Sequence, residues 1–64
     1  MWVKMDKLTV GQEIIGIRDN KSIYYCQGMR VSAIDENSVI IRHPHGDLEY
    51  VEDPETKFWV EEEK

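Results

Sequence analysis

Turn-forming residues interrupt this chain at short intervals, and their spacing limits what it can fold into. The polar turn segments VGQE, DNKS, DENS, HPHGD and EDPET separate short runs that are rich in β-branched and aromatic residues. Short strands separated by regular turns are typical of an all-β barrel or sandwich. No apolar stripe with helical spacing continues for three turns, so the sequence does not predict a long helix.

The strands are expected in the runs between these turns. Their predicted ranges are 12–18, 23–34, 38–43, 48–52 and 57–61, with 2–5 as a candidate sixth strand. In the first of them, Ile15 and Ile17 are expected on one face, and Ile14 then needs cover from elsewhere. Gly28 falls inside the long strand and indicates a bulge or a sharp bend, by which a small barrel closes.

Size and cysteine content restrict the class of protein. The 64 residues predict a single domain, 1–64, with a frayed acidic carboxy terminus at 61–64. The single cysteine, Cys26, cannot form an intrachain disulfide, and a lone thiol is typical of a reducing cytosol. The chain shows no signal-peptide pattern and no apolar run near the roughly 20 residues of a membrane span. We therefore expect a cytoplasmic domain that does not enter a membrane.

Charge is distributed unevenly along the chain. The net charge is −5: residues 1–34 carry five Lys or Arg against three Asp or Glu, whereas residues 35–64 carry three against ten. An acidic molecule repels phosphate backbones, so this balance disfavours nucleic acid and favours a protein partner with a basic surface. The opposite charge of the two halves also allows a weak homodimer beside the monomer, through exposed edge strands.

The segment from Val10 to Arg42 resembles the KOW-type pattern. A glycine precedes each of the first two long strands, and a hydrophobic pair, a polar turn and a Val-x-Val-like strand follow. The positions that carry this pattern are Gly11, Gly28, Val31, Ile34, Val39 and Ile41. The resemblance implies a small SH3-like barrel of about five antiparallel strands, similar to short bacterial and phage proteins. It leaves the function open, because SH3-like barrels serve many unrelated functions.

The segment HPHGD holds the only candidate metal ligands. Neutral imidazoles such as those of His43 and His45 are ligands for zinc or nickel. Pro44 and Gly46, however, indicate a tight turn, in which the histidines are solvated tip residues. We therefore expect neither a metal nor a cofactor.

The sequence does not favour an enzyme. Cys26 has no neighbouring base to activate its thiol and is expected to act as a small apolar residue. A catalytic pair of carboxylates needs a cleft that desolvates one of them. A barrel of this size leaves little interior for a cleft of roughly 300 Å³ or more.

The favoured function is a small acidic interaction module that binds a protein. Its predicted contact residues are the carboxylates Asp47, Glu49, Glu52 and Asp53 and the aromatic anchors Tyr24, Tyr50 and Trp59. Aromatic side chains are enriched in protein interfaces. Carboxylates spaced along strands would also imitate a phosphate backbone and occupy the basic site of a nucleic-acid-binding protein.

The alternative is a KOW-type module that binds nucleic acid or associates with the ribosome or the transcription machinery. It would use Lys4, Lys7, Arg18, Lys21 and Arg30. This alternative requires the five basic side chains to converge on one face, since phosphate contacts supply much of the affinity for nucleic acid.

Overall fold

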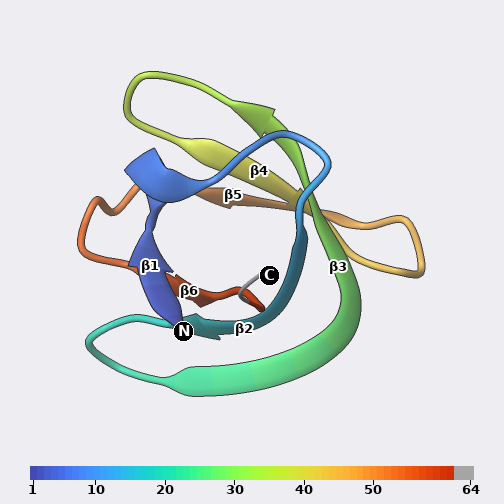
Figure 1. Ribbon diagram of the computed structural model, residues 1–64, viewed down its shortest axis with the longest axis horizontal. Helices are drawn as coiled ribbons and strands as arrows, with labels where there is room; N and C mark the ends of the chain where they lie inside the picture. Colours follow the sequence, from blue (N-terminus) through green and yellow to red (C-terminus); the bar gives the residue numbers. More distant parts are fainter. Residues whose placement is uncertain (62–64) are drawn as a thin grey trace.

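The computed structural model describes residues 1–61 and confirms an all-β chain with one antiparallel sheet of six strands (Figure 1). The strands are β1 (Trp2–Lys4), β2 (Glu13–Arg18), β3 (Ile23–Ile34), β4 (Val39–Arg42), β5 (Leu48–Val51) and β6 (Lys57–Trp59). One turn of 3-10 helix, η1 (Met5–Lys7), follows β1. No helix in residues 1–61 has the length and apolar character needed to cross a membrane. The predicted fraying at 61–64 falls mostly on residues 62–64, outside the described chain.

The order of strands in the sheet is β1-β6-β2-β3-β4-β5. Strand β6 therefore lies between the first two strands of the chain, and Trp2 of β1 is opposite Trp59 of β6. The sheet curls so that β4 and β5 lie across the interior from β6 and β2 (Figure 1). Its two edge strands, β1 and β5, are not paired with each other, so the sheet is curled but open.

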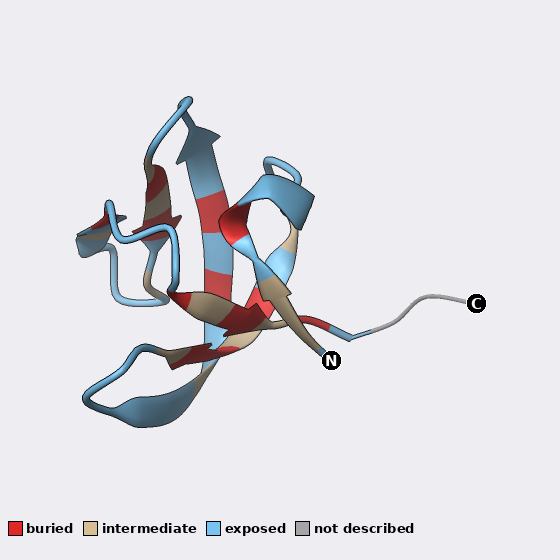
Figure 2. Cartoon of the chain, turned by 90° about the vertical axis from the view of Figure 1, so that its left-hand side faces the viewer, coloured by how far each residue is buried: buried red, intermediate tan, exposed pale blue. Residues whose placement is uncertain are grey.

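Strand β3 is long, and it bends at Gly28 as the sequence predicts. Gly28 has a φ of +90°, a conformation that glycine adopts without a steric penalty. The register of the β2–β3 pair shifts there: Ile14 is opposite Met29, but Gly16 is opposite Tyr25. Figure 2 shows buried residues along the middle of β3 and exposed residues towards its ends. The bend lets one strand pair with β2 at one end and β4 at the other.

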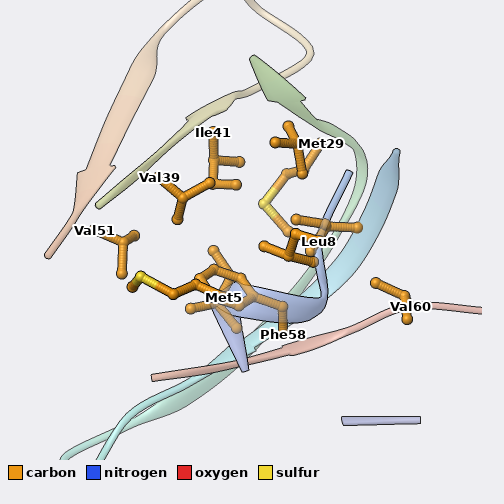
Figure 3. Close-up of a cluster of buried hydrophobic side chains, with 11 residues drawn as sticks. Met5, Leu8, Met29, Val39, Ile41, Val51, Phe58 and Val60 are labelled. Carbon is orange, nitrogen blue, oxygen red and sulfur yellow. The ribbon is translucent and has the colours of Figure 1, made fainter. Parts of the chain in front are cut away.

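The core lies inside the curl of the sheet (Figure 3). Its most buried side chains come from every central strand: Ile14, Met29, Val31, Val39, Ile41 and Phe58. Met5 of η1 and the following Leu8 cover one side of this cluster. Burying these side chains stabilises the fold by roughly 1.5–3 kcal/mol each.

The prediction for the faces of β2 is wrong. Ile14 and Ile17 are both buried in the core, whereas Ile15 is only half-buried. Residues three apart cannot share a face on a regular strand. The register shift between Ile14 and Gly16 makes this arrangement possible.

The turn between β2 and β3 is held by Asp19. Its Oδ1 accepts hydrogen bonds from the backbone N–H groups of Lys21 and Ser22, both at 2.8 Å. These bonds favour the charged carboxylate and lower the pKa of Asp19. Asp19 therefore acts as the side-chain partner that such turns require.

Candidate functional site

Strand β5 forms one edge of the sheet and pairs only with β4 among the described residues. Alternate residues of β5 point outward, so that Leu48 and Tyr50 are 46% and 65% exposed. Glu49 is half-buried, and Val51 belongs to the core. The edge strand thus presents an aromatic and an aliphatic side chain beside a backbone edge that no strand of residues 1–61 covers.

The four predicted carboxylates lie along β5 and the two turns that flank it. Asp47 precedes the strand and pairs with His45, whose Nε2 is 2.9 Å from Asp47 Oδ2. Glu52 and Asp53 follow the strand and are exposed. Glu49 differs from these three because its carboxylate is hydrogen-bonded to Tyr24 and His43.

The end of β5 at Glu52 gains further carboxylates from the β3–β4 turn. Asp35, Glu36, Asn37, Ser38 and Glu52 together line a shallow depression of about 350 Å³. Asp35 and Glu36 were not among the residues predicted for the contact surface. The turn segment DENS shows these two acids in the sequence, but only the pairing of β4 with β5 places that turn beside the end of β5.

Glu49 joins three elements through hydrogen bonds. The Tyr24 hydroxyl of β3 lies 2.7 Å from Glu49 Oε1 and 2.8 Å from Oε2, and His43 Nε2 lies 2.8 Å from Oε1. Partial burial and the Glu49 carboxylate together raise the pKa of Tyr24. The Tyr24–Glu49 hydrogen bonds therefore connect β3 to β5. Because its hydroxyl is engaged, Tyr24 is less available to contact a partner than the sequence suggests.

The predicted turn at Pro44 is present. The carbonyl of His43 accepts a hydrogen bond from Gly46 N at 2.9 Å, and Gly46 has a φ of +103°. The prediction of two solvated histidines is correct for His45, whose side chain is 66% exposed, and wrong for His43, at 16%. His43 is shielded because it faces Glu49 and the neighbouring His45 ring.

No group of three or more His, Cys, Asp or Glu side chains in the described residues is placed to hold a metal ion. Cys26 is half-buried and packs against the core, and its thiol donates a hydrogen bond to the Gln27 carbonyl at 3.5 Å.

The third predicted anchor, Trp59, lies on a different surface. Cross-strand pairing places Trp2, Trp59, Gly16 and Tyr25 opposite one another on the outer face of β1, β6, β2 and β3. We call Trp2, Trp59 and Tyr25 the aromatic row. The Trp2 ring lies 5.3 Å from the Trp59 ring and 6.1 Å from the Tyr25 ring. Tyr25, and not Tyr24, is therefore the tyrosine that joins Trp59.

A second row crosses the same face two residues further along the strands. Lys4, Lys57 and Arg18 are directly opposite one another on β1, β6 and β2, and we call them the cationic row. The Arg18 guanidinium lies 4.8 Å from the centre of the Trp2 ring, and Lys4 Nζ lies 3.6 Å from Glu55 Oε1. Lys57 was missed by the sequence analysis because only the strand register places it between Lys4 and Arg18.

The five basic residues of the alternative prediction do not converge on one face. Lys4 and Arg18 belong to the cationic row, and Lys21 lies in the adjoining β2–β3 turn. Lys7 and Arg30 instead line a groove with an open volume of about 1070 Å³. The full set of five therefore does not form the single nucleic-acid surface that this prediction requires.

That groove is larger than the sequence analysis expected for a chain of this size. It lies between the loop after η1 and the strands β2 and β3, with Ile15 and Val60 among its apolar lining and Glu13 among its acidic lining. Arg30 Nη1 donates a hydrogen bond to the Gly11 carbonyl at 3.0 Å. Charges of both signs and scattered apolar groups give the groove no clear preference for one class of ligand.

Comparisons of the chain with protein-family models, curated proteins and solved structures find no match.

Proposed function

We propose that this chain is a non-enzymatic interaction module that binds a basic segment of a partner protein along the edge of β5. The observation that carries the proposal is that β5 has no strand on its outer side among the described residues. Carboxylates flank this free edge, with Asp47 before the strand and Glu52 after it. An extended segment that adds to a sheet edge gains backbone hydrogen bonds, and its alternate side chains supply specificity.

The side chains of β5 suit such an addition. Tyr50 and Leu48 point outward and offer apolar contact to the added segment. Natural edge strands are commonly guarded by lysine, proline or inward-pointing charges that prevent pairing. Strand β5 has neither lysine nor proline, and the charge of its one half-buried acid, Glu49, is engaged by Tyr24 and His43. The opposite edge, β1, carries Lys4.

The carboxylates around β5 set the charge of the partner. Asp47 lies at one end of the strand, and Glu52 lies at the other beside Asp35 and Glu36. Complementary charge speeds association and excludes wrong partners more than it adds affinity. A partner segment with lysine or arginine at both ends matches this pattern, and a nucleic-acid-binding protein offers such a basic segment.

We also propose that the curled sheet is a small SH3-like barrel of the KOW type. Three features support this assignment. The strand β3 bends at Gly28 and serves both halves of the sheet, Gly11 and Gly28 both have a φ of +90°, and three of the KOW-type positions, Val31, Val39 and Ile41, lie in the core. A structure solved by NMR would test whether β1 and η1 close the barrel against β5.

A peptide selection tests the β5 proposal. Displayed random peptides are selected on the full chain, and the site of the strongest binders is mapped from ¹⁵N amide shifts. Selected peptides are expected to be extended and basic, to shift the amides of β5, and to bind at least tenfold more weakly to Tyr50→Lys. Tyr25→Lys is the matched control, because Tyr25 and Tyr50 are both 65% exposed but lie on different surfaces.

The proposal is wrong if the selected peptides lack basic residues or if Tyr25→Lys and Tyr50→Lys weaken binding equally. Binding that does not weaken between low and physiological salt would also contradict the assigned role of the carboxylates.

A further inference from the structure

The outer face of β1, β6, β2 and β3 holds an arrangement that the β5 proposal does not use. The cationic row and the aromatic row lie side by side and share β1 and β6, while Arg18 adds β2 and Tyr25 adds β3. The alternation of these strands places both rows on the face opposite the core residues Phe58 and Ile17, where Lys4 and Tyr25 are exposed and the other members are half-buried. None of these side chains belongs to β5, so a ligand on this face is independent of the proposed partner of β5.

The cationic row is unfavourable for the isolated protein. Like charges directly opposite each other on neighbouring strands destabilise a sheet. Lys4, Lys57 and Arg18 nevertheless occupy three adjacent strands, in a chain whose net charge is −5. Within the described residues, the only ion pair of the row joins Lys4 to Glu55, and both side chains are exposed. An anionic ligand would relieve this repulsion.

The aromatic row specifies what kind of anion fits. The two rows are two residues apart along each strand, which is about 7 Å, and neighbouring strands are about 4.8 Å apart. A single nucleic-acid strand carries a line of phosphates beside a line of bases whose faces stack on aromatic side chains. The Asp and Glu side chains of an acidic peptide have no such faces, and a duplex hides its bases from stacking.

Gly16 contributes to the shape of this surface. It occupies the place in the aromatic row between Trp59 and Tyr25, and a Cβ atom there would lie 2.9 Å from Tyr25 Cδ1. The absence of a side chain lets the Tyr25 ring lie close to the sheet while remaining 65% exposed. Tyr25 is thus the member of the row with the most surface available to a base.

We propose that this face binds a short single-stranded nucleic acid, with phosphates along the cationic row and bases against the aromatic row. Only Lys4 and Arg18 are shared with the basic set predicted from sequence. Lys57 and the three aromatic residues are new to it. The net negative charge of the chain makes the binding weak at physiological salt and easiest to detect at low salt.

Fluorescence anisotropy with labelled ten-residue oligonucleotides, oligo(dT) and oligo(U), tests the proposal at about 50 mM salt. Tyr25→Leu, which keeps apolar bulk but removes the aromatic ring, is expected to weaken binding by about tenfold. Lys57→Gln is expected to weaken binding and to reduce the slope of log K against log salt by about 0.7. Tyr50→Leu and Arg42→Gln are the matched controls, because both residues are exposed and lie on β5 and β4. The controls are expected to leave the affinity unchanged.

The outcomes separate this proposal from simple attraction between polyanion and cation. A preference for DNA or RNA identifies the natural strand, and either result supports the proposal. Absence of binding to both oligonucleotides would overturn it. It would also be overturned if polyglutamate of equal charge displaced the oligonucleotides equally well, or if Arg42→Gln weakened binding as much as Lys57→Gln.

Discussion

Gly28 of β3 lies directly against Pro44 of the β4–β5 turn, and a Cβ atom added to Gly28 would be 3.0 Å from the Pro44 Cβ atom. The bend of β3 and the turn that carries His43 are therefore in contact. Any other residue at position 28 would need a backbone with positive φ, and its Cβ atom would also displace the turn. This contact joins the bend of β3 to the turn from which His43 reaches Glu49.

Gly28→Ala is expected to destabilise the fold more than Gly11→Ala. Both glycines have a φ of +90°, but a Cβ at Gly11 meets nothing within 4 Å. Gly11→Ala should lower the free energy of unfolding by about 1–2 kcal/mol, the cost of a left-handed backbone. Gly28→Ala should lose about 1 kcal/mol more through the clash with Pro44. Urea denaturation measures both losses, and equal losses would show that the Pro44 contact is unimportant. Adding Pro44→Gly to Gly28→Ala removes the clashing Pro44 Cβ atom and should recover the extra loss, measured relative to Pro44→Gly alone.

Glu49→Gln is expected to lower the pKa of Tyr24. Burial and the Glu49 carboxylate raise this pKa above its ordinary value of 10.0, which means that folding favours the neutral phenol. The stabilisation from Tyr24 is therefore complete below pH 10 and is lost as the pH rises above it. Removing the negative charge of Glu49 should bring the Tyr24 titration to lower pH, as followed from its ¹³Cζ NMR shift. Glu52→Gln serves as the control, since the Tyr24 hydroxyl donates to Glu49 and not to Glu52. An equal change in both variants would contradict the assigned pairing.

Gly16→Ala is expected to disturb the aromatic row. The new methyl group would lie 2.9 Å from Tyr25 Cδ1 and 3.1 Å from Trp59 Cβ. The Tyr25 ring can swing away, but the Trp59 Cβ is held by the backbone, so we expect a loss of about 1 kcal/mol and a shift in tryptophan fluorescence. Tyr25→Ala in the same chain should restore part of the stability. If Gly16→Ala is neutral by itself, the row is more loosely packed than its ring distances indicate.

Local sequence patterns predict the strands of this chain well. The range 23–34 is one strand with a break at Gly28, and the other strands begin or end within two residues of their predicted limits. Glycines mark the bend and the turn because the backbone at positions 28 and 46 has a positive φ, which few other residues adopt. The prediction of an all-β chain depends only on such local preferences.

The surfaces were harder to predict because they depend on pairing between distant strands. Nothing near Lys57 in the sequence indicates that it lies between Lys4 and Arg18. Glu49 looks like one acid among several, yet the bend of β3 brings Tyr24 within hydrogen-bonding distance of it. The error at Ile15 has the same origin, since alternation along β2 is broken by a register shift set by its partner.

The position of β6 between β1 and β2 also affects how the protein is made. Strands β2, β3 and β4 each pair with the next strand in the sequence, so β2 to β5 can form hairpins as they are synthesised. Strand β1 has no place in the sheet until β6 has been added beside β2, although β1 leaves the ribosome first. Contacts between such distant segments form slowly. Trp59 must therefore be synthesised and leave the exit tunnel before the tryptophans of β1 and β6 can meet. Until then Trp2 is without its partner strand.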